Sequence, residues 1–480
     1  MKNHGHHLRA TLILACLAQF MVILDVSVVN VALPAIRSGL HFSEVDLQWV
    51  VNAYTVTFAG FLLLGGRAAD LLGRRRVFVA GLVLFSLASL AGGLAGSRGL
   101  LIGARAIQGL GGAIVAPASL SILTTTFSEG AARNRAVGIW GAMGGAGGAA
   151  GVLLGGVLTD LLSWRWILFV NLPIGLLAAL FSQRLLTEGR DESATRDFDL
   201  RGALSATLGL SLLVLGIVRS DQSGWGSAPT LALLVAGVAL LAAFLGIEGR
   251  LAHAPLMPLR IWRSRTLTAA NVVVALVGAA SFGMWFFLSL YLQQVLGYSP
   301  IRAGLAFLPM TVCIVLGSVG ASRLVVKVGA RPLLVVGMGS LTVGLAWFTD
   351  ISVHGTYLGA ILGASLLTAV GIGLAFVPAT ISAVAGVARA EAGLASGLVN
   401  TSRLFGGALG LAILAALATA RTDTLLHGGG TTVHAALTSG FRVAFWVAAG
   451  ISLAGGLVAA LALPGVKAPS REGAAAVESA

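Results

Sequence analysis

Long apolar runs alternate with short polar connections along almost the whole chain. Roughly 20 apolar residues are enough for a helix to cross the hydrocarbon core of a bilayer. The pattern therefore predicts fourteen membrane-spanning helices joined by short connections. We expect them at about residues 11–33, 47–66, 77–96, 99–121, 134–158, 166–186, 200–219, 230–250, 267–292, 303–323, 332–349, 356–378, 393–418 and 441–463.

The composition agrees with this class. Hydrophobic residues make up 57% of the chain and charged residues only 10%, whereas soluble domains carry about 25% charged residues. A soluble globular protein is therefore excluded. No lysine follows a glycine, so the Gly-Lys-Ser/Thr loop that binds nucleotide phosphates is absent and ATP-driven transport within this chain is not expected. Since no nucleophile–base pair, metal-ligand cluster or redox motif stands out, we expect neither an enzyme nor a bound metal or cofactor.

The basic residues follow the topology. The formal net charge is +13, which in a soluble protein would suggest a nucleic-acid partner. If the N-terminus is cytoplasmic, however, the inner segments hold 22 Lys and Arg and the outer segments hold seven. The positive-inside rule then predicts a multi-pass cell-membrane protein with both termini in the cytoplasm, its basic loops facing an anionic inner leaflet. We expect no nucleic-acid partner.

Two stretches of the chain resemble each other at a constant offset of 259 residues, which is typical of a duplicated transporter. The matched glycines are Gly138, Gly148 and Gly151 with Gly397, Gly407 and Gly410. We therefore expect an all-α membrane protein of two six-helix bundles with two additional central helices. The predicted divisions are an N-terminal bundle at 1–186, a linker with the two inserted helices at 187–266, a C-terminal bundle at 267–464 and a disordered cytoplasmic tail at 465–480.

The connection after the second predicted helix has a distinctive composition. It contains Gly66, Asp70, Gly73, Arg74 and Arg75 at the spacing G-x-x-x-D-x-x-G-R-R. Glycines allow a tight turn, an aspartate can cap a helix or pair with an arginine, and the arginines face the inner leaflet. Here the chain resembles the major facilitator superfamily, which implies the major facilitator fold and a gating role for this loop.

Further motifs resemble the fourteen-helix drug:proton antiporters, the EmrB/QacA branch of that superfamily. They lie at Leu24–Pro34, Trp164–Gly175 and Tyr291–Pro300. The resemblance runs from about Leu24 to Pro464. It implies a secondary exporter that couples the efflux of small lipophilic compounds, including cationic ones, to proton influx. We expect the protein to be monomeric.

Asp25 is the first candidate for proton coupling. It lies about 14 residues, or roughly 21 Å, into the first predicted helix, well inside a core about 30 Å thick. An ionised carboxylate there costs several kcal/mol unless it is paired or reached by water, so reversible protonation is expected. A structural ion pair is the alternative.

Arg105 is expected at the same depth as Asp25, because its helix enters the membrane from the other side. The resemblance implies that this arginine assists proton transfer. An arginine favours the charged carboxylate and desolvation disfavours it, so moving either group would switch the proton affinity of Asp25. A static pair again remains the alternative.

Glycines recur along one face of the fifth predicted helix, where the resemblance places an antiporter motif. A seam of this kind lets a neighbouring helix approach closely. Val152 stands where the family has a proline, which removes the usual kink. The glycines are Gly141, Gly144, Gly148, Gly151, Gly155 and Gly156.

Several polar and aromatic residues within the predicted helices are candidates for lining a substrate cavity. Arg403 is expected about ten residues into the thirteenth helix, on the cavity side if the duplication is right, where it could contact substrate or form a structural pair. Aromatic side chains could wall a pocket for flat lipophilic cations, although aromatic residues in membrane helices more often pack in the core or anchor the helix at the interface. The candidates are Asn30, Gln108, Trp140, Trp285, Phe286, Tyr291 and Arg403.

The leading function is a multidrug exporter that works by alternating access. One alternative is an exporter of a single metabolite or natural product that confers self-resistance. Another is a membrane receptor that has kept the fold and lost transport. Charges such as Asp25 and Arg105 are costly to retain in a membrane without use, which argues against the receptor.

Overall fold

The computed structural model describes residues 2–127, 131–189, 199–251, 255, 257–385, 387, 392–428 and 430–463. The middle of the predicted linker, 190–198, and the predicted tail, 465–480, lie outside these ranges. Within them the chain is helical, and fourteen helices are long and apolar enough to cross a membrane. The predicted number of spans and the all-α class are confirmed.

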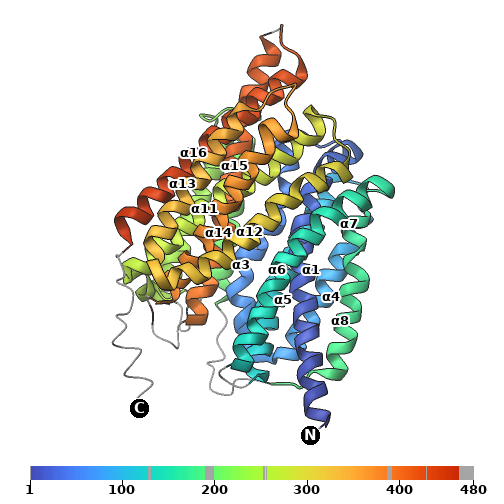
Figure 1. Cartoon of the computed structure of the whole chain (residues 1–480), viewed down its shortest axis with the longest axis vertical. Helices are drawn as coiled ribbons and strands as arrows, with labels where there is room; N and C mark the ends of the chain where they lie inside the picture. The colour runs from blue at the N-terminus through green and yellow to red at the C-terminus, as the bar shows by residue number, and fades with distance from the viewer. Residues whose placement is uncertain are drawn as a thin grey trace.

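The first six spans form one side-by-side group (Figure 1). α3 packs on α5, α1 on α6 and α4 on α5. The second and sixth spans each include a short helix before the main one. The elements of this N-terminal half are α1 (Lys2–Leu40), α2 (Glu44–Leu47), α3 (Trp49–Leu72), α4 (Arg74–Gly93), α5 (Arg98–Thr126), α6 (Ala131–Leu161), α7 (Trp166–Phe169) and α8 (Asn171–Leu185).

The last six spans form the second group, in which α11 packs on α15, α13 on α14 and α13 on α16. Three of them contain a short π- or 3-10-helical segment at one end. The elements of this C-terminal half are α11 (Arg265–Leu290), η3 (Tyr291–Val295), α12 (Pro300–Val328), α13 (Ala330–Trp347), η4 (Phe348–Asp350), η5 (Tyr357–Ile361), α14 (Leu362–Ala385), α15 (Ala392–His427) and α16 (Val433–Ala462).

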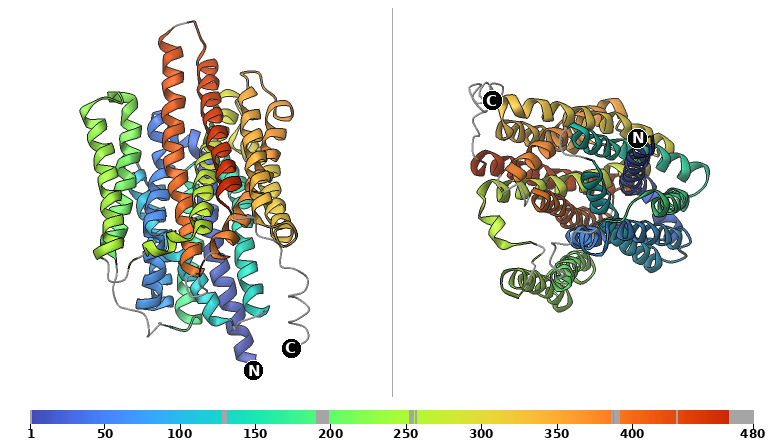
Figure 2. Two further views of the ribbon diagram at one scale, coloured as in Figure 1. Left: turned by 90° about the vertical axis from the view of Figure 1, so that its left-hand side faces the viewer. Right: turned by 90° about the horizontal axis from the view of Figure 1, so that it is seen from below.

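Two further spans lie to one side of both halves, as the separate green pair in Figure 2 shows. They are α9 (Leu200–Ser223) and α10 (Ala228–Gly246), followed by η1 (Ile247–Leu251) and η2 (Leu259–Arg263). α9 packs against α3 and α15. Gly60 of α3 lies so close to Thr207 of α9 that a Cβ atom there would overlap the Thr207 hydroxyl.

Some helices extend beyond the apolar runs. α1 continues through Pro34 to Leu40, and α15 and α16 form an extended pair at the top of Figure 1. Backbone hydrogen bonding continues into water where hydropathy falls, so a hydropathy pattern marks only the apolar part of a helix.

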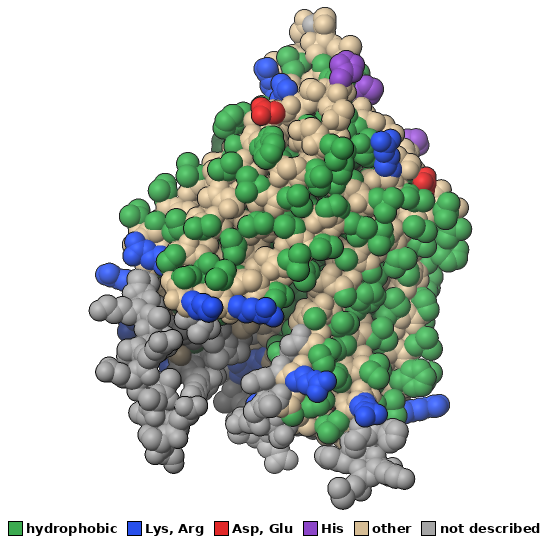
Figure 3. Space-filling view, in the orientation of Figure 1, with side chains coloured by type: hydrophobic (Ala, Val, Ile, Leu, Met, Phe, Trp, Pro, Cys, Tyr) green, Lys and Arg blue, Asp and Glu red, His purple; other side chains and the backbone are tan. Residues whose placement is uncertain are grey.

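We call the end of the bundle where α1 begins the lower face and the opposite end the upper face, as in Figure 1. In Figure 3 hydrophobic side chains cover the flank, and most visible Lys and Arg gather toward the lower face.

The two halves meet mainly through three helix pairs, α6 with α12, α3 with α15 and α1 with α11. Toward the upper face the contacts are close. The Ser289 hydroxyl donates to the Asn30 carbonyl at 2.5 Å, and the Gln293 amide donates to the Val31 carbonyl at 2.8 Å. Lower on α6, Gly141 and Gly144 have no atom within 4 Å of the position a Cβ would take. The contacts between the two halves are therefore close toward the upper face, whereas a Cβ at Gly141 or Gly144 of α6 would meet no neighbour within 4 Å.

Candidate functional site

Asp25 lies at the centre of a buried hydrogen-bond network in the N-terminal half. Its side chain is fully buried. Asp25 Oδ2 lies 2.6 Å from Nη1 of Arg105. The other carboxylate oxygen, Oδ1, accepts hydrogen bonds from the side-chain amides of Gln108 at 2.7 Å and Asn171 at 2.8 Å. Three donors from α5 and α8 thus converge on one carboxylate of α1.

Arg105 is held from several sides. Its Nε donates to the Val50 carbonyl at 3.0 Å, and Nη1 also donates to the Gln108 side-chain oxygen at 2.6 Å. The guanidinium lies 4.4 Å from the centre of the Tyr54 ring. Gln108 in turn donates to the Ser89 hydroxyl at 2.8 Å. Removing either Asp25 or Arg105 would therefore leave a buried charge without its partner, which is strongly destabilising.

The structure brings the two predicted proton-coupling residues into contact. It places Gln108, a candidate for the substrate cavity, in the network instead, where its side chain is fully buried. Sequence reasoning did not single out Asn171, although it stands inside the Trp164–Gly175 motif. That motif is the signal that could have identified Asn171. Ser89 and Tyr54 carry no comparable signal in the sequence.

The glycine seam on α6 differs from the predicted stripe. Gly147, Gly151 and Gly155, spaced by four residues, approach α1, while Gly156 lies against Ile301 of α12. Positions four residues apart are not exactly above one another, so the line of contact with α1 turns gradually around α6. It runs through Gly147, Gly151 and Gly155 and away from Gly141 and Gly144. Gly148 is in ordinary contact with Ser27 and Thr311. The close-packing prediction is therefore wrong for Gly141 and Gly144, which face open space.

Two of the aromatic cavity candidates are core residues. Phe286 and Tyr291 are buried at 1% and 0% exposure within the C-terminal half, and the Tyr291 hydroxyl donates to the Ser352 carbonyl. Helical periodicity explains this burial, because only some positions along α11 and η3 can face the other half. Phe286 and Tyr291 are therefore packed in the core of this conformation, and their role in a substrate cavity stays a prediction.

The remaining candidates are partly exposed. The Trp140 indole donates to the Ser119 hydroxyl at 3.0 Å, which ties α6 to α5. The Trp285 ring lies 4.9 Å from the Phe307 ring. Asn30 donates to the Val26 carbonyl one turn earlier, and its own carbonyl takes part in the upper contact between the halves. Trp140, Trp285 and Asn30 therefore lie on three different elements, α6, α11 and α1.

The predicted gating loop forms a tight turn between α3 and α4. Gly73 ends α3 with φ +107°, a conformation that favours glycine. Gly329 makes the equivalent turn between α12 and α13 with φ +83°. Gly66 contacts Pro117 of α5, and the side chain of Asp70 lies outside what the structure describes.

Residues 187–189, which the sequence assigned to the linker, hold this turn. Glu188 accepts a hydrogen bond from the Arg75 backbone N–H at 3.1 Å, and the Gly189 carbonyl accepts one from the Arg74 backbone at 3.0 Å. The Glu188 carboxylate also lies 3.6 Å from the side chains of Arg75 and Arg76. α4 has no side-chain cap of its own, so this segment satisfies the free N–H groups at its start.

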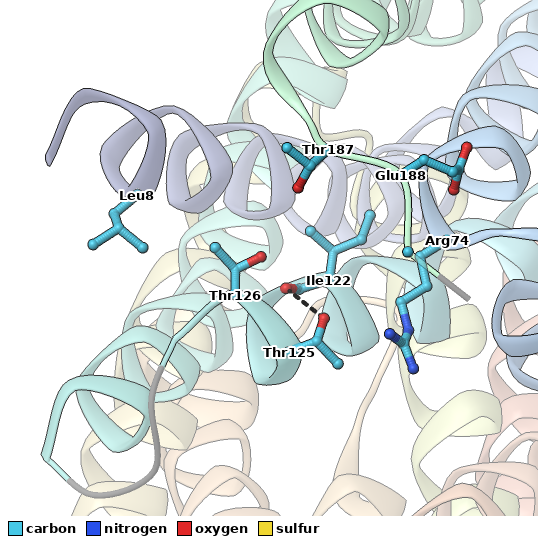
Figure 4. Close-up of a pocket in the computed structure, with 8 residues that line it drawn as sticks. Leu8, Arg74, Ile122, Thr125, Thr126, Thr187 and Glu188 are labelled. Atoms are coloured by element: carbon cyan, nitrogen blue, oxygen red, sulfur yellow. Dashed lines mark hydrogen bonds between the residues drawn. The ribbon is translucent and has the colours of Figure 1, made fainter. Parts of the chain in front are cut away.

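A cavity of about 490 Å³ lies beside this segment at the lower face (Figure 4). Arg74 and Glu188 border it, and the Arg74 side chain donates to the Ser121 hydroxyl of α5 at 2.8 Å. The cavity belongs to the N-terminal half and lies apart from the Asp25 network. Its lining is completed by Leu8, Ile122, Thr125, Thr126, Thr187 and Gly189.

Replacing Glu188 by alanine should loosen the first turn of α4. The loss of a capping acceptor costs about 1 kcal/mol, and exposed ion pairs add little. We expect amide hydrogen exchange at Arg75 and its neighbours to become about fivefold faster, from the same capping energy. Glu188→Gln keeps an acceptor oxygen and serves as the matched control. Unchanged exchange in Glu188→Ala would show that the cap contributes nothing.

The chain matches known transporters over most of its length. The family model described as Major Facilitator Superfamily matches residues 15–411. The cephamycin export protein of Amycolatopsis lactamdurans is 46% identical over 84% of this chain and 83% of its own length. The multidrug resistance protein Stp of Mycobacterium tuberculosis strain CDC 1551 is 36% identical over 87% of this chain and 77% of its own length.

The fold is also shared with solved transporters. A bacterial homologue of the human lysosomal transporter Spinster, crystallised in an inward-facing and unoccupied conformation, superposes with a TM-score of 0.69. The match covers 96% of this chain and 97% of that one, at 17% identity. This structural similarity shows the fold, whereas the sequence matches show the family. The protein, with its fourteen spans, is a multi-pass membrane protein and belongs to the Major Facilitator Superfamily.

Proposed function

We propose that this protein is a proton-coupled exporter of small lipophilic compounds in the cell membrane. The observation that carries the proposal is the fully buried contact between Asp25 and Arg105, an ion pair deep inside a membrane-spanning bundle. Such a pair is costly, and in membrane transporters it commonly marks a proton or ion pathway. The names of the relatives, a cephamycin export protein and a multidrug resistance protein, support export as the direction.

The proposed orientation places both termini in the cytoplasm. The excess of Lys and Arg in the lower loops supports it. With this orientation the upper contacts Asn30–Ser289 and Val31–Gln293 hold the two halves together on the outer side of the membrane. The described conformation would then be the one that loads substrate.

Coupling follows from the state of Asp25. When ionised it attracts Arg105 and accepts the amides of Gln108 and Asn171. A proton that arrives from outside would neutralise Asp25 and remove the charge that holds Arg105. The conformation in which Arg105 lies close to Asp25 and the one in which it does not would then bind this proton with different affinities. A proton can shift the equilibrium between the two conformations only by the difference in its binding free energy to each of them. The bundles would then move about the membrane midplane and the compound would leave on the other side.

The breadth of substrates separates two candidate functions. An exporter of one natural product is supported by the cephamycin export relative, and a multidrug exporter by the resistance protein Stp. The two functions share the same proton machinery. They differ only in the side chains that contact the compound.

Efflux from an efflux-deficient host tests the proposal. We expect cells that express the chain to expel ethidium or another member of a broad compound panel, and an uncoupler to abolish the efflux. Cells with an empty vector are the control. Protection against a single natural product without dye efflux would favour the specific exporter. Export that persists unchanged in the uncoupler, or no export of any compound, would overturn the proposal.

A further inference from the structure

Arg403 lies inside the membrane, close to the boundary between the two halves. It is on α15, nine residues after Leu394, where the span begins, which places it roughly 14 Å along the helix and near mid-depth. The next two residues, Leu404 and Phe405, pack against buried residues of the N-terminal half. The Arg403 carbonyl lies against Gly278 of α11.

The side chain of Arg403 has no acidic partner among the described residues. Its guanidinium lies 5.5 Å from the centre of the Phe376 ring on α14. Its Nε atom is buried and makes no hydrogen bond, and neither does the hydroxyl of nearby Thr401. Asp25, the acid at a comparable depth, is occupied by Arg105, Gln108 and Asn171. Among the described residues, therefore, no acidic side chain compensates the charge of Arg403.

An uncompensated cation in a membrane is expensive, whereas an anion brought next to it recovers much of that cost. A guanidinium with one face on an aromatic ring keeps its N–H edge free for a carboxylate, which it can bind through two parallel hydrogen bonds. The same charge would repel a cationic compound at this position, because the low dielectric strengthens both effects.

The other half leaves room at the equivalent depth. Under the 259-residue offset Arg403 corresponds to Gly144 and Asn400 to Gly141. Both glycines of α6 face open space, with no atom within 4 Å of a would-be Cβ. Of these equivalent positions, therefore, only the one in the C-terminal half carries a charged side chain.

We propose that Arg403 binds the carboxylate or another single anionic group of the exported compound. The substrates of this exporter are then amphipathic anions, with an apolar body that packs against surfaces such as Phe376. This inference rests on the proposed export function and narrows its substrate class. It departs from the lipophilic cations that the family resemblance includes.

Three fluorescent compounds that share one aromatic body and differ in charge test the inference. They are dansyl-β-alanine, its uncharged amide and the amine dansyl-ethylenediamine, with ethidium as a further cation. Full-length protein in proteoliposomes with an imposed pH gradient should transport the carboxylate in preference to the other three. Arg403→Gln should lower carboxylate transport at least tenfold and change transport of the amide less than twofold, and Arg403→Lys should retain an intermediate rate.

Arg421→Gln is the matched control, because Arg421 lies on the same helix, is exposed, and donates to the Ser439 hydroxyl. It should transport all compounds like wild type. Thermal unfolding separates misfolding from a binding defect: Arg403→Gln removes an uncompensated charge and should unfold at the same or a higher temperature than wild type. If Arg403→Gln instead unfolds at a lower temperature, Arg403 has a structural role and the inference fails.

The outcomes also distinguish this inference from the proposed function. Proton-driven transport of ethidium or the amine without transport of the carboxylate overturns the inference and leaves the exporter in place. Carboxylate transport at the same rate in Arg403→Gln as in wild type also overturns the inference and leaves the exporter in place. Absence of proton-driven transport of every compound overturns the proposed function, and the inference with it.

Discussion

Replacing Asp25 by asparagine is expected to abolish proton-driven export, with uphill transport falling at least a hundredfold. Asparagine keeps the size of the side chain and one acceptor oxygen for Gln108 or Asn171, but it cannot take up a proton. It also leaves Arg105 without a counter-charge in a fully buried position, which costs about 3–5 kcal/mol for a buried pair. Substrate uptake into proteoliposomes under an imposed pH gradient measures the loss.

The double variant Asp25→Asn, Arg105→Gln separates coupling from stability. It removes both charges and should recover much of the unfolding temperature lost in the single variant, because no unpaired charge remains. It should still show no proton-driven transport. Exchange of labelled for unlabelled compound without a gradient should survive, since it needs only the movement of the halves. Proton uptake equal to wild type in Asp25→Asn would rule out this carboxyl as the coupling group.

Replacing Gly151 by valine is expected to have the second-largest effect, by forcing α1 and α6 apart. A Cβ at Gly151 would lie 2.8 Å from the Leu24 carbonyl and 2.6 Å from the Ser27 Cβ, next to Asp25. Overpacking of this kind costs about 1–3 kcal/mol. We expect a lower unfolding temperature together with reduced proton-driven export, because the displaced segment of α1 carries the coupling carboxylate.

Gly144→Val is the matched control on the same helix. Nothing lies within 4 Å of its would-be Cβ, and a substitution away from packed features usually changes stability by no more than about 0.5 kcal/mol. Thermal unfolding of the two variants in detergent compares them directly. Equal destabilisation by both substitutions would show that the close contact at Gly151 does not limit the packing of α1.

Much of the candidate site could be predicted because the relevant signals are local. An aspartate and an arginine inside apolar runs stand out wherever they fall, since each costs free energy in a membrane. Their depths follow from the rise of 1.5 Å per residue in a helix. Gln108, three residues after Arg105, is predicted from its segment to line a cavity. Its true neighbours, Asp25 and Ser89, come from other helices and could not be read from its own segment.

The sequence by itself determined the fourteen spans, the superfamily and the pairing of a carboxylate with an arginine at one depth, because hydropathy, helical rise and short motifs are properties of single segments. Only the tertiary structure decided that Asn171 donates to Asp25, that Glu188 caps α4, that Tyr291 lies in the core, and that Arg403 has no acidic partner among the described residues. These depend on which face each helix turns toward another, and that is set by packing between segments far apart in the chain.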